Sequence, residues 1–128
     1  MDQITNQSIL NRSKKFVAHL QAEGMRLNGA YLFGSYATGH AHRDSDIDIA
    51  VVSQDLSGDW LDDYCHLTRI ADDFDARMEV VSFRPRDFRD ENPLVWQIKT
   101  TGIPLLGNGK NGKRRATAKP KVRRSKRA

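Results

Sequence analysis

The chain has 128 residues, of which 38% are hydrophobic and 29% charged, and it contains one cysteine. This length fits one domain with a modest core, and the lone Cys65, expected to be a semi-buried thiol, excludes an internal disulfide. The sequence has no apolar run of about 18 residues and no basic-then-apolar leader. We therefore expect no membrane span, no signal peptide and a cytoplasmic location.

The net charge of +5 conceals an uneven distribution. Ten of the 21 basic residues lie between positions 110 and 127, where there is no acidic residue. Residues 1–109 therefore carry 11 basic and 16 acidic side chains, a formal charge of −5. We expect a globular domain over residues 1–106 and a disordered basic tail over 107–128. The tail is either a solubilising extension or a sequence-blind contact for a polyanion such as RNA.

Helix and strand signals alternate along the first half of the domain. Apolar residues near helical spacing predict a helix over 9–23, ended by Gly24. A short apolar run predicts a strand over 30–33, and residues 36–43 predict a helical turn and a polar loop that contains His40, His42 and Arg43. A β-branched run predicts a second strand over 46–52.

The second half continues this alternation. Ser57 or Asp59 is expected to cap a helix that ends near residue 73. The expected buried face of this helix consists of Trp60, Leu61, Tyr64, Leu67 and Ala71, and its expected solvated face of Asp62, Asp63, Asp72 and Asp73. A third strand is predicted over 77–83, a helix capped by Asn92 up to Gly102, and an edge segment over 103–106. The order predicts an α/β (mixed α+β) fold, a small mixed sheet flanked by helices.

Two aspartates begin the second predicted strand. Because residues i and i+2 of a strand share a face, Asp46 and Asp48 should point the same way, with Ile47 and Ile49 on the other side. Paired carboxylates repel each other, and a divalent cation removes that cost. Mg²⁺ is usually held by one or two carboxylates together with the phosphates of a substrate. The pair therefore indicates a magnesium site for a nucleotide.

Gly34 and Ser35 follow the first predicted strand and supply the complementary part. A glycine at a strand end lets the backbone approach a ligand, and the following N–H groups and the Ser35 hydroxyl can bind a phosphate. A phosphate cradle opposite a carboxylate pair is suited to metal-assisted phosphoryl or nucleotidyl transfer.

The pattern Gly34-Ser35, ten residues, Asp46-x-Asp48 resembles the signature of the DNA polymerase β-like nucleotidyltransferase superfamily. The compact length and the surrounding sequence are most similar to its minimal nucleotidyltransferase family, over about residues 8–106. This resemblance implies the nucleotidyltransferase palm fold.

The resemblance also implies a third carboxylate in the middle of a later strand. Glu79 matches by strand context, one methylene longer than the usual aspartate, and a lone carboxylate inside a strand needs a partner such as the same metal cluster. Asp75 is the rival candidate, although it precedes the apolar run. Asp46, Asp48 and Glu79 would bind two Mg²⁺ ions. Glu79 is alternatively the base for the acceptor proton.

By the same resemblance, an NTP such as ATP would give its NMP group to an acceptor hydroxyl. Family members of this kind are typically paired with a separate HEPN-type toxin protein and act as antitoxins that adenylylate a toxin tyrosine. Two other classes stay open: a transferase for a small hydroxylated molecule, and a non-catalytic module that binds nucleic acid or a partner through its basic tail.

Overall fold

A computed structural model describes residues 3–106 of the chain, so the predicted basic tail lies outside the described residues. The elements are α1 (Gln3–Ala22), β1 (Gly29–Phe33), α2 (Ser35–Thr38), β2 (Ile47–Val52), α3 (Trp60–Ala71), β3 (Met78–Phe83), a 3-10 turn η1 (Pro85–Asp87), α4 (Pro93–Thr101) and β4 (Ile103–Pro104). The strands form one mixed sheet in the order β3-β2-β1-β4, in which β2 and β3 are parallel and the other pairs antiparallel. The predicted mixed sheet with flanking helices is confirmed. No described helix is both long and apolar enough to cross a membrane.

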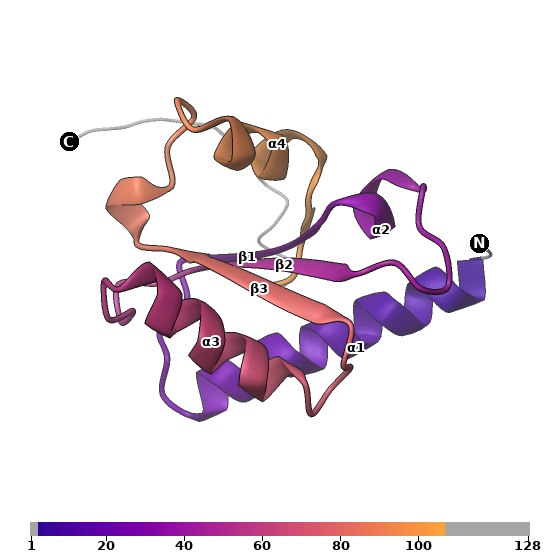
Figure 1. Cartoon of the computed structure of the whole chain (residues 1–128), viewed down its shortest axis with the longest axis horizontal. Helices are drawn as coiled ribbons and strands as arrows, with labels where there is room; N and C mark the ends of the chain where they lie inside the picture. The colour runs from indigo at the N-terminus through magenta and orange to yellow at the C-terminus, as the bar shows by residue number, and fades with distance from the viewer. Residues whose placement is uncertain (1–2, 107–128) are drawn as a thin grey trace.

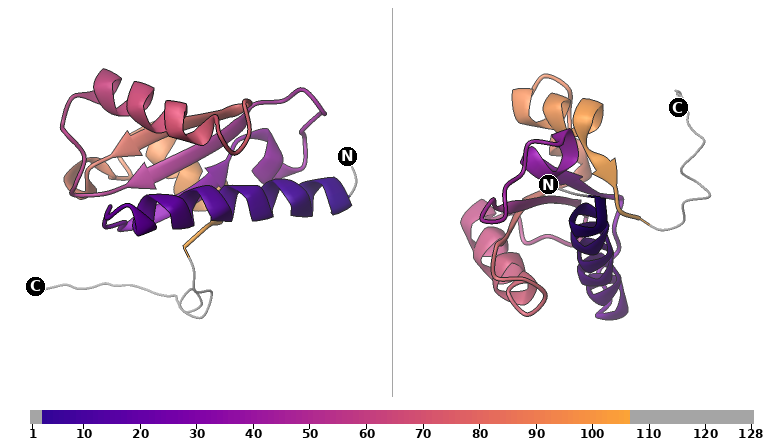
Figure 2. Two further views of the ribbon diagram at one scale, coloured as in Figure 1. Left: turned by 90° about the horizontal axis from the view of Figure 1, so that it is seen from below. Right: turned by 90° about the vertical axis from the view of Figure 1, so that its right-hand side faces the viewer.

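Helices cover both faces of the sheet, and the two faces differ. The helices α1 and α3 pack on one face, whereas α2 and α4 lie on the other (Figures 1 and 2). The main core lies on the α1/α3 side and includes Ile47, Ile49 and Val80, each fully buried. A smaller cluster of Phe33, Ala50 and Ile98 lies on the α4 side. Strand alternation therefore directs the Asp48 side chain, like that of Ala50, towards the α2/α4 face.

Two backbone N–H groups at the outer edge of β3 form hydrogen bonds within the chain. The Met78 N–H donates to the Asp75 carbonyl at 3.0 Å, within the turn that precedes the strand. The Val80 N–H donates to the Thr68 hydroxyl of α3 at 3.2 Å. Edge strands otherwise present unpaired backbone groups to solvent. Two backbone donors at the outer edge of β3 are thus already used within the chain.

Most predicted elements are confirmed, with small shifts at their ends. The helix α1 begins at Gln3 instead of residue 9, because the polar residues before Ile9 carry no apolar periodicity to reveal the first turns. Asp59 caps α3 by accepting the Asp62 N–H at 3.1 Å, and Asn92 caps α4 by accepting the Leu94 N–H at 2.9 Å. Both caps were among the candidates that the sequence offered.

Four expectations for residues of α3 were wrong. Its buried residues are Asp63, Leu67 and Ala71, at four-residue spacing, and this stripe leaves Leu61 and Cys65 on the outer side of the helix. Trp60 in the first turn is 59% exposed and stacks on Tyr64 at the surface. Asp63, expected on the solvated face, is buried because its carboxylate accepts hydrogen bonds from the N–H and the hydroxyl of Ser57.

The docking of α4 on the sheet gives a stability prediction. Ile98 is fully buried against Phe33 and Ala50, so Ile98→Ala should lower the free energy of unfolding by about 2–4 kcal/mol through lost burial and the cavity left behind. Trp96 on the same helix is 55% exposed, and Trp96→Ala should cost less than about 0.5 kcal/mol. Urea unfolding of both variants measures the difference, and equal losses would contradict this account of the packing.

Candidate active site

Three carboxylates that are far apart in the sequence meet at the start of β2 and β3. The parallel register places Asp48 opposite Glu79 on neighbouring strands, and Asp46 immediately precedes β2. One oxygen from each of Asp46, Asp48 and Glu79 lies within 4.8 Å of the others. Asp46 and Glu79 are exposed and Asp48 is half-buried, so solvent reaches the cluster. The structure thus brings together the three acids that the sequence singled out.

The electrostatics of this cluster are unfavourable for three charges. Burial first, and then the nearby charges of Asp46 and Glu79, together raise the pKa of Asp48 to about 6. Within residues 3–106, the ion pairs that form involve other acids, so no lysine or arginine neutralises this cluster. Uncompensated carboxylates at this spacing favour the binding of a cation.

A divalent ion fits this donor set. Mg²⁺ binds oxygen at about 2.0–2.1 Å in octahedral geometry, so two ligand oxygens on one ion are about 3 Å apart when adjacent and about 4.2 Å apart when opposite. The three carboxylate oxygens lie within 4.8 Å of one another, and side-chain rotations would bring them to these separations. Carboxylate oxygens are also the hard ligands that such an ion prefers. Asp46, Asp48 and Glu79 are therefore the residues able to hold a metal here.

Gly34 makes a tight corner directly beside Asp48. Its backbone has φ 76° and ψ −151°, a conformation that is essentially restricted to glycine. A Cβ atom at this position would overlap the Oδ2 atom of Asp48. The Gly34 carbonyl accepts the N–H of Ala37 at 3.0 Å, which starts the short helix α2, and Ser35 is half-buried at its first position. The predicted glycine-serine pair therefore lies next to the acid cluster.

The loop between α2 and Asp46 is mostly polar and exposed, as expected, apart from the buried Ala41. His40, His42 and Arg43 are all exposed. The Ser45 hydroxyl accepts the His42 N–H at 2.7 Å, so Ser45 fixes the local backbone before Asp46. The histidine and arginine side chains stand near the site without a contact that assigns them a role.

Asp75, the rival for the third acid, takes part in a different cluster. Its carboxylate forms ion pairs with Arg12 of α1 and with Arg77, and these hydrogen bonds, that of Arg77 first, hold the pKa of Asp75 well below its usual range. Arg77 also donates to the Tyr36 hydroxyl at 3.1 Å. The sequence did not indicate that Arg77 and Tyr36 contact each other beside the site. The one available signal was the position of Arg77, two residues before Glu79.

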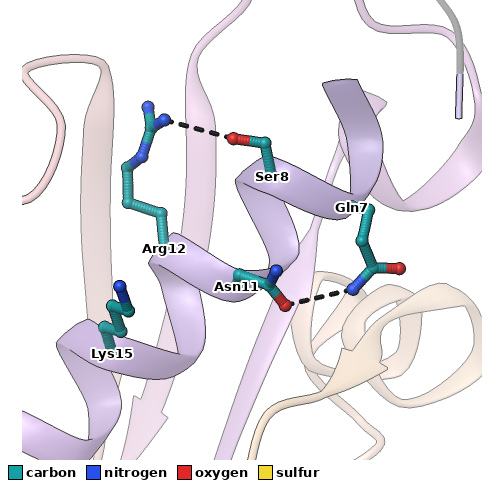
Figure 3. Close-up of a pocket in the computed structure, with 5 residues that line it drawn as sticks. All are labelled: Gln7, Ser8, Asn11, Arg12 and Lys15. Atoms are coloured by element: carbon teal, nitrogen blue, oxygen red, sulfur yellow. Dashed lines mark hydrogen bonds between the residues drawn. The ribbon is translucent and has the colours of Figure 1, made fainter. Parts of the chain in front are cut away.

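A second polar surface lies on α1 and contains none of the three acids. The hollow in Figure 3 is lined by Gln7, Ser8, Asn11, Arg12 and Lys15. Two hydrogen bonds link these side chains, Gln7 to Asn11 at 3.0 Å and Arg12 to Ser8 at 3.2 Å. Its polar groups thus largely satisfy one another, and the convergent carboxylates remain the better candidate for chemistry.

The corner at Gly34 gives a prediction with a matched control. Gly34→Ala should lower the free energy of unfolding by about 2 kcal/mol and displace Asp48, because both the positive φ and the overlap with Oδ2 oppose a side chain. Gly39 has a similar φ of 83°, but a Cβ there would meet nothing within 4 Å. Gly39→Ala should therefore lose only the backbone part, about 1 kcal/mol. Thermal unfolding and Mn²⁺ titration compare the two, and equal loss of Mn²⁺ affinity would contradict the prediction.

The raised pKa of Asp48 predicts a pH-dependent stability in the absence of divalent cations. A carboxyl with a higher pKa in the folded than in the unfolded state binds its proton more tightly when folded, so this group destabilises the fold as pH rises from about 4 to about 6. At pH 7, Asp48→Asn should raise the free energy of unfolding by about 1 kcal/mol, a value discounted for the half-exposed position.

Urea unfolding in EDTA at pH 7 and pH 4 tests this expectation. The gain from Asp48→Asn should vanish at the lower pH, where the wild-type carboxyl is already protonated. Asp44→Asn changes an exposed acid in the same loop and serves as the control, with little effect at either pH. A loss of stability in Asp48→Asn at pH 7 would refute the argument.

Known proteins are similar to this chain in fold and in sequence. Protein adenylyltransferase MntA from Shewanella oneidensis is 34% identical over 96 residues, which cover 73% of this chain and 63% of the relative, so the chain spans less than two thirds of the length of that relative. A crystal structure of a toxin–antitoxin with AMP-PNP is 29% identical, with a TM-score of 0.55 and coverage of 77% of this chain and 76% of the other.

A candidate nucleotidyltransferase from Sulfolobus solfataricus is similar in fold, with a TM-score of 0.56 at 18% identity over 77% of this chain and 80% of the other. The family described as "Polymerase beta, Nucleotidyltransferase" matches residues 14–111, a range that includes Gly34 and all three acids of the cluster. The chain therefore belongs to the polymerase beta nucleotidyltransferase family.

Proposed function

We propose that the chain transfers AMP from ATP to a hydroxyl group of a partner protein, as the antitoxin of a toxin–antitoxin pair. The observation that carries the proposal is the convergence of Asp46, Asp48 and Glu79 beside the corner at Gly34. Its support comes from membership of a nucleotidyltransferase family and from similarity to a protein adenylyltransferase and to a toxin–antitoxin structure with AMP-PNP.

The acid cluster is proposed to bind Mg²⁺, as two ions. Asp46 and Asp48 would hold one ion together with the triphosphate, and all three acids would hold the second. When bound, the ions neutralise charge on the phosphates and lower the pKa of the acceptor hydroxyl. The raised pKa of Asp48 means that, without a bound cation, the cluster resists full ionisation, so metal binding should release a proton at mildly acidic pH.

Gly34 and Ser35 are proposed to bind the phosphates of the nucleotide. Gly34 has no side chain between the backbone and Asp48, so a phosphate can approach the N–H groups at the start of α2. The Ser35 hydroxyl would add a hydrogen-bond donor. The phosphates would then lie beside both the corner and the carboxylates, as in-line displacement requires.

The reaction is a displacement at the α-phosphorus. The acceptor oxygen forms a bond to the α-phosphorus while the bond from that phosphorus to the bridging oxygen breaks, and pyrophosphate leaves. The acceptor proton must be removed, and Glu79, an exposed member of the cluster, would take it in the alternative in which Glu79 acts as a base instead of a metal ligand.

The partner is proposed to be a separate HEPN-type toxin protein with a tyrosine as the acceptor. The relatives in solved structures include the MntA–HpeT toxin–antitoxin complex. Within residues 3–106 the fold consists of one sheet with its helices, and we propose that a second protein supplies the surface that holds the acceptor.

Labelled ATP tests the proposal. The full chain is incubated with Mg²⁺, a HEPN-type toxin purified from the native host, and ATP labelled at either the α- or the γ-phosphate. We expect the toxin to gain the α-label and none of the γ-label, with AMP located on tyrosine by mass spectrometry. Asp48→Asn and Glu79→Gln should reduce labelling at least 100-fold, because both alter the proposed metal ligands.

The control is Asp44→Asn, an exposed acid of the same loop outside the cluster, which should label at the wild-type rate. A labelled small molecule in place of protein would refute the protein acceptor. Absence of any label, together with salt-sensitive RNA binding by the full chain, would refute the enzyme and favour a non-catalytic module.

A further inference from the structure

The Arg77 side chain forms several hydrogen bonds that no sequence pattern indicated. Its guanidinium donates to both carboxylate oxygens of Asp75, at 2.9 and 2.7 Å, to the Tyr36 hydroxyl at 3.1 Å and to the Arg43 carbonyl at 2.7 Å. A planar guanidinium with five donors can satisfy all of these partners at once, which an ammonium cannot. Arg77 thus joins β3 to α2 and to the loop that precedes β2.

This residue holds the segment that carries Asp46 from both sides. The guanidinium binds the Arg43 carbonyl, and the Arg77 carbonyl accepts the Ile47 N–H at 2.9 Å. Between these two bonds lies Asp46, whose own carboxylate is exposed. The position of Asp46 relative to β3 is therefore set by Arg77, the residue that immediately precedes β3.

Tyr36 extends the same connection to α2. Its hydroxyl accepts from Arg77 and donates to the His42 carbonyl at 3.1 Å, and the ring is 5% exposed. Because Tyr36 follows Gly34 and Ser35 directly, its ring anchors the phosphate-side corner to the loop of Asp46. The three parts of the site, namely the corner, the aspartate loop and β3, thus meet at the Arg77 guanidinium.

Asp75 sets the orientation of Arg77 and is itself shared with α1. The Asp75 side chain is 8% exposed and accepts from both Arg12 and Arg77. Arg12, drawn in Figure 3, reaches Asp75 from α1 but bonds to no residue of the loop at 39–46 within the described part of the chain. Arg12 and Arg77 therefore share one carboxylate, and they differ in their contact with the aspartate loop.

We propose that Arg77 is a positioning residue that fixes Asp46 against Asp48 and Glu79 and thereby sets the affinity of the site for a divalent cation and its nucleotide. This inference rests on the proposed function, since it assumes that the acid cluster binds a metal–nucleotide. Residues that orient metal ligands typically contribute about 10–100-fold to metal affinity. Arg77 makes no contact with the three acids through its side chain, so its effect passes through the loop.

The test compares Arg77→Met with Arg12→Met. The Arg12 variant removes the other ion pair of Asp75 and keeps the hydrogen bonds of Arg77 to Tyr36 and Arg43. Mn²⁺ binding is followed by electron paramagnetic resonance with and without AMP-PNP, and amide hydrogen exchange is followed over residues 42–47. For Arg77→Met we expect Mn²⁺ affinity to fall about 10–100-fold and amides at 42–47 to exchange faster. Arg12→Met should change Mn²⁺ affinity less than about 3-fold and leave exchange at 42–47 as in the wild type.

Should Arg77→Met fail to fold, Arg77→Lys provides the test, because it keeps the charge beside Asp75 but cannot serve Tyr36 and Arg43 as well. The expected result is again faster exchange at 42–47 with weaker Mn²⁺ binding. Unchanged exchange and unchanged Mn²⁺ affinity in the Arg77 variants would overturn the inference, as would equal losses in Arg12→Met. If the wild-type chain binds no Mn²⁺, the proposed function fails, whereas the exchange data still decide whether Arg77 holds the loop.

Discussion

The parallel pairing of β2 with β3 is the constraint on which the site depends. It sets Asp48 opposite Glu79, although 30 positions separate them in the sequence, and it brings Asp46 to the same end of the sheet. The fold accepts the resulting repulsion because the other faces of these strands are fully buried through Ile47, Ile49 and Val80. Hydrophobic burial on one face of the strands thus holds the three acids together on the other face, despite the repulsion between their charges.

Much of this arrangement was predictable from the sequence because its signals are local. The spacing from Gly34 to Asp48 and the alternation around Ile47 and Ile49 predicted both the strands and the direction of the acids. The choice of Glu79 over Asp75 followed from strand context, and the structure places Glu79 in the cluster and Asp75 among arginines. The register that brings Glu79 opposite Asp48 could not be predicted, because it arises from contacts between distant segments.

The failures have a common physical origin. An apolar pattern on a helix shows which side could be buried, but not how far the neighbouring sheet extends beneath it. Trp60 follows the helical pattern and still lies at the surface, while Asp63 is buried because Ser57 of the preceding loop satisfies its carboxylate. The bonds of Arg77 to Tyr36 and Arg43 are equally non-local. Such polar contacts across the fold leave no periodic trace in the sequence.

The hydrogen bond from Val80 to Thr68, together with that from Met78 to the Asp75 carbonyl, restricts how another protein can reach this site. A visiting chain that lengthened the sheet beside β3 would need those two amides, and they are already taken. Recognition by strand addition is therefore blocked next to Glu79. Under the proposed function, a protein acceptor would approach from the α2/α4 face with a projecting side chain such as tyrosine, instead of lying alongside β3 as an extended backbone.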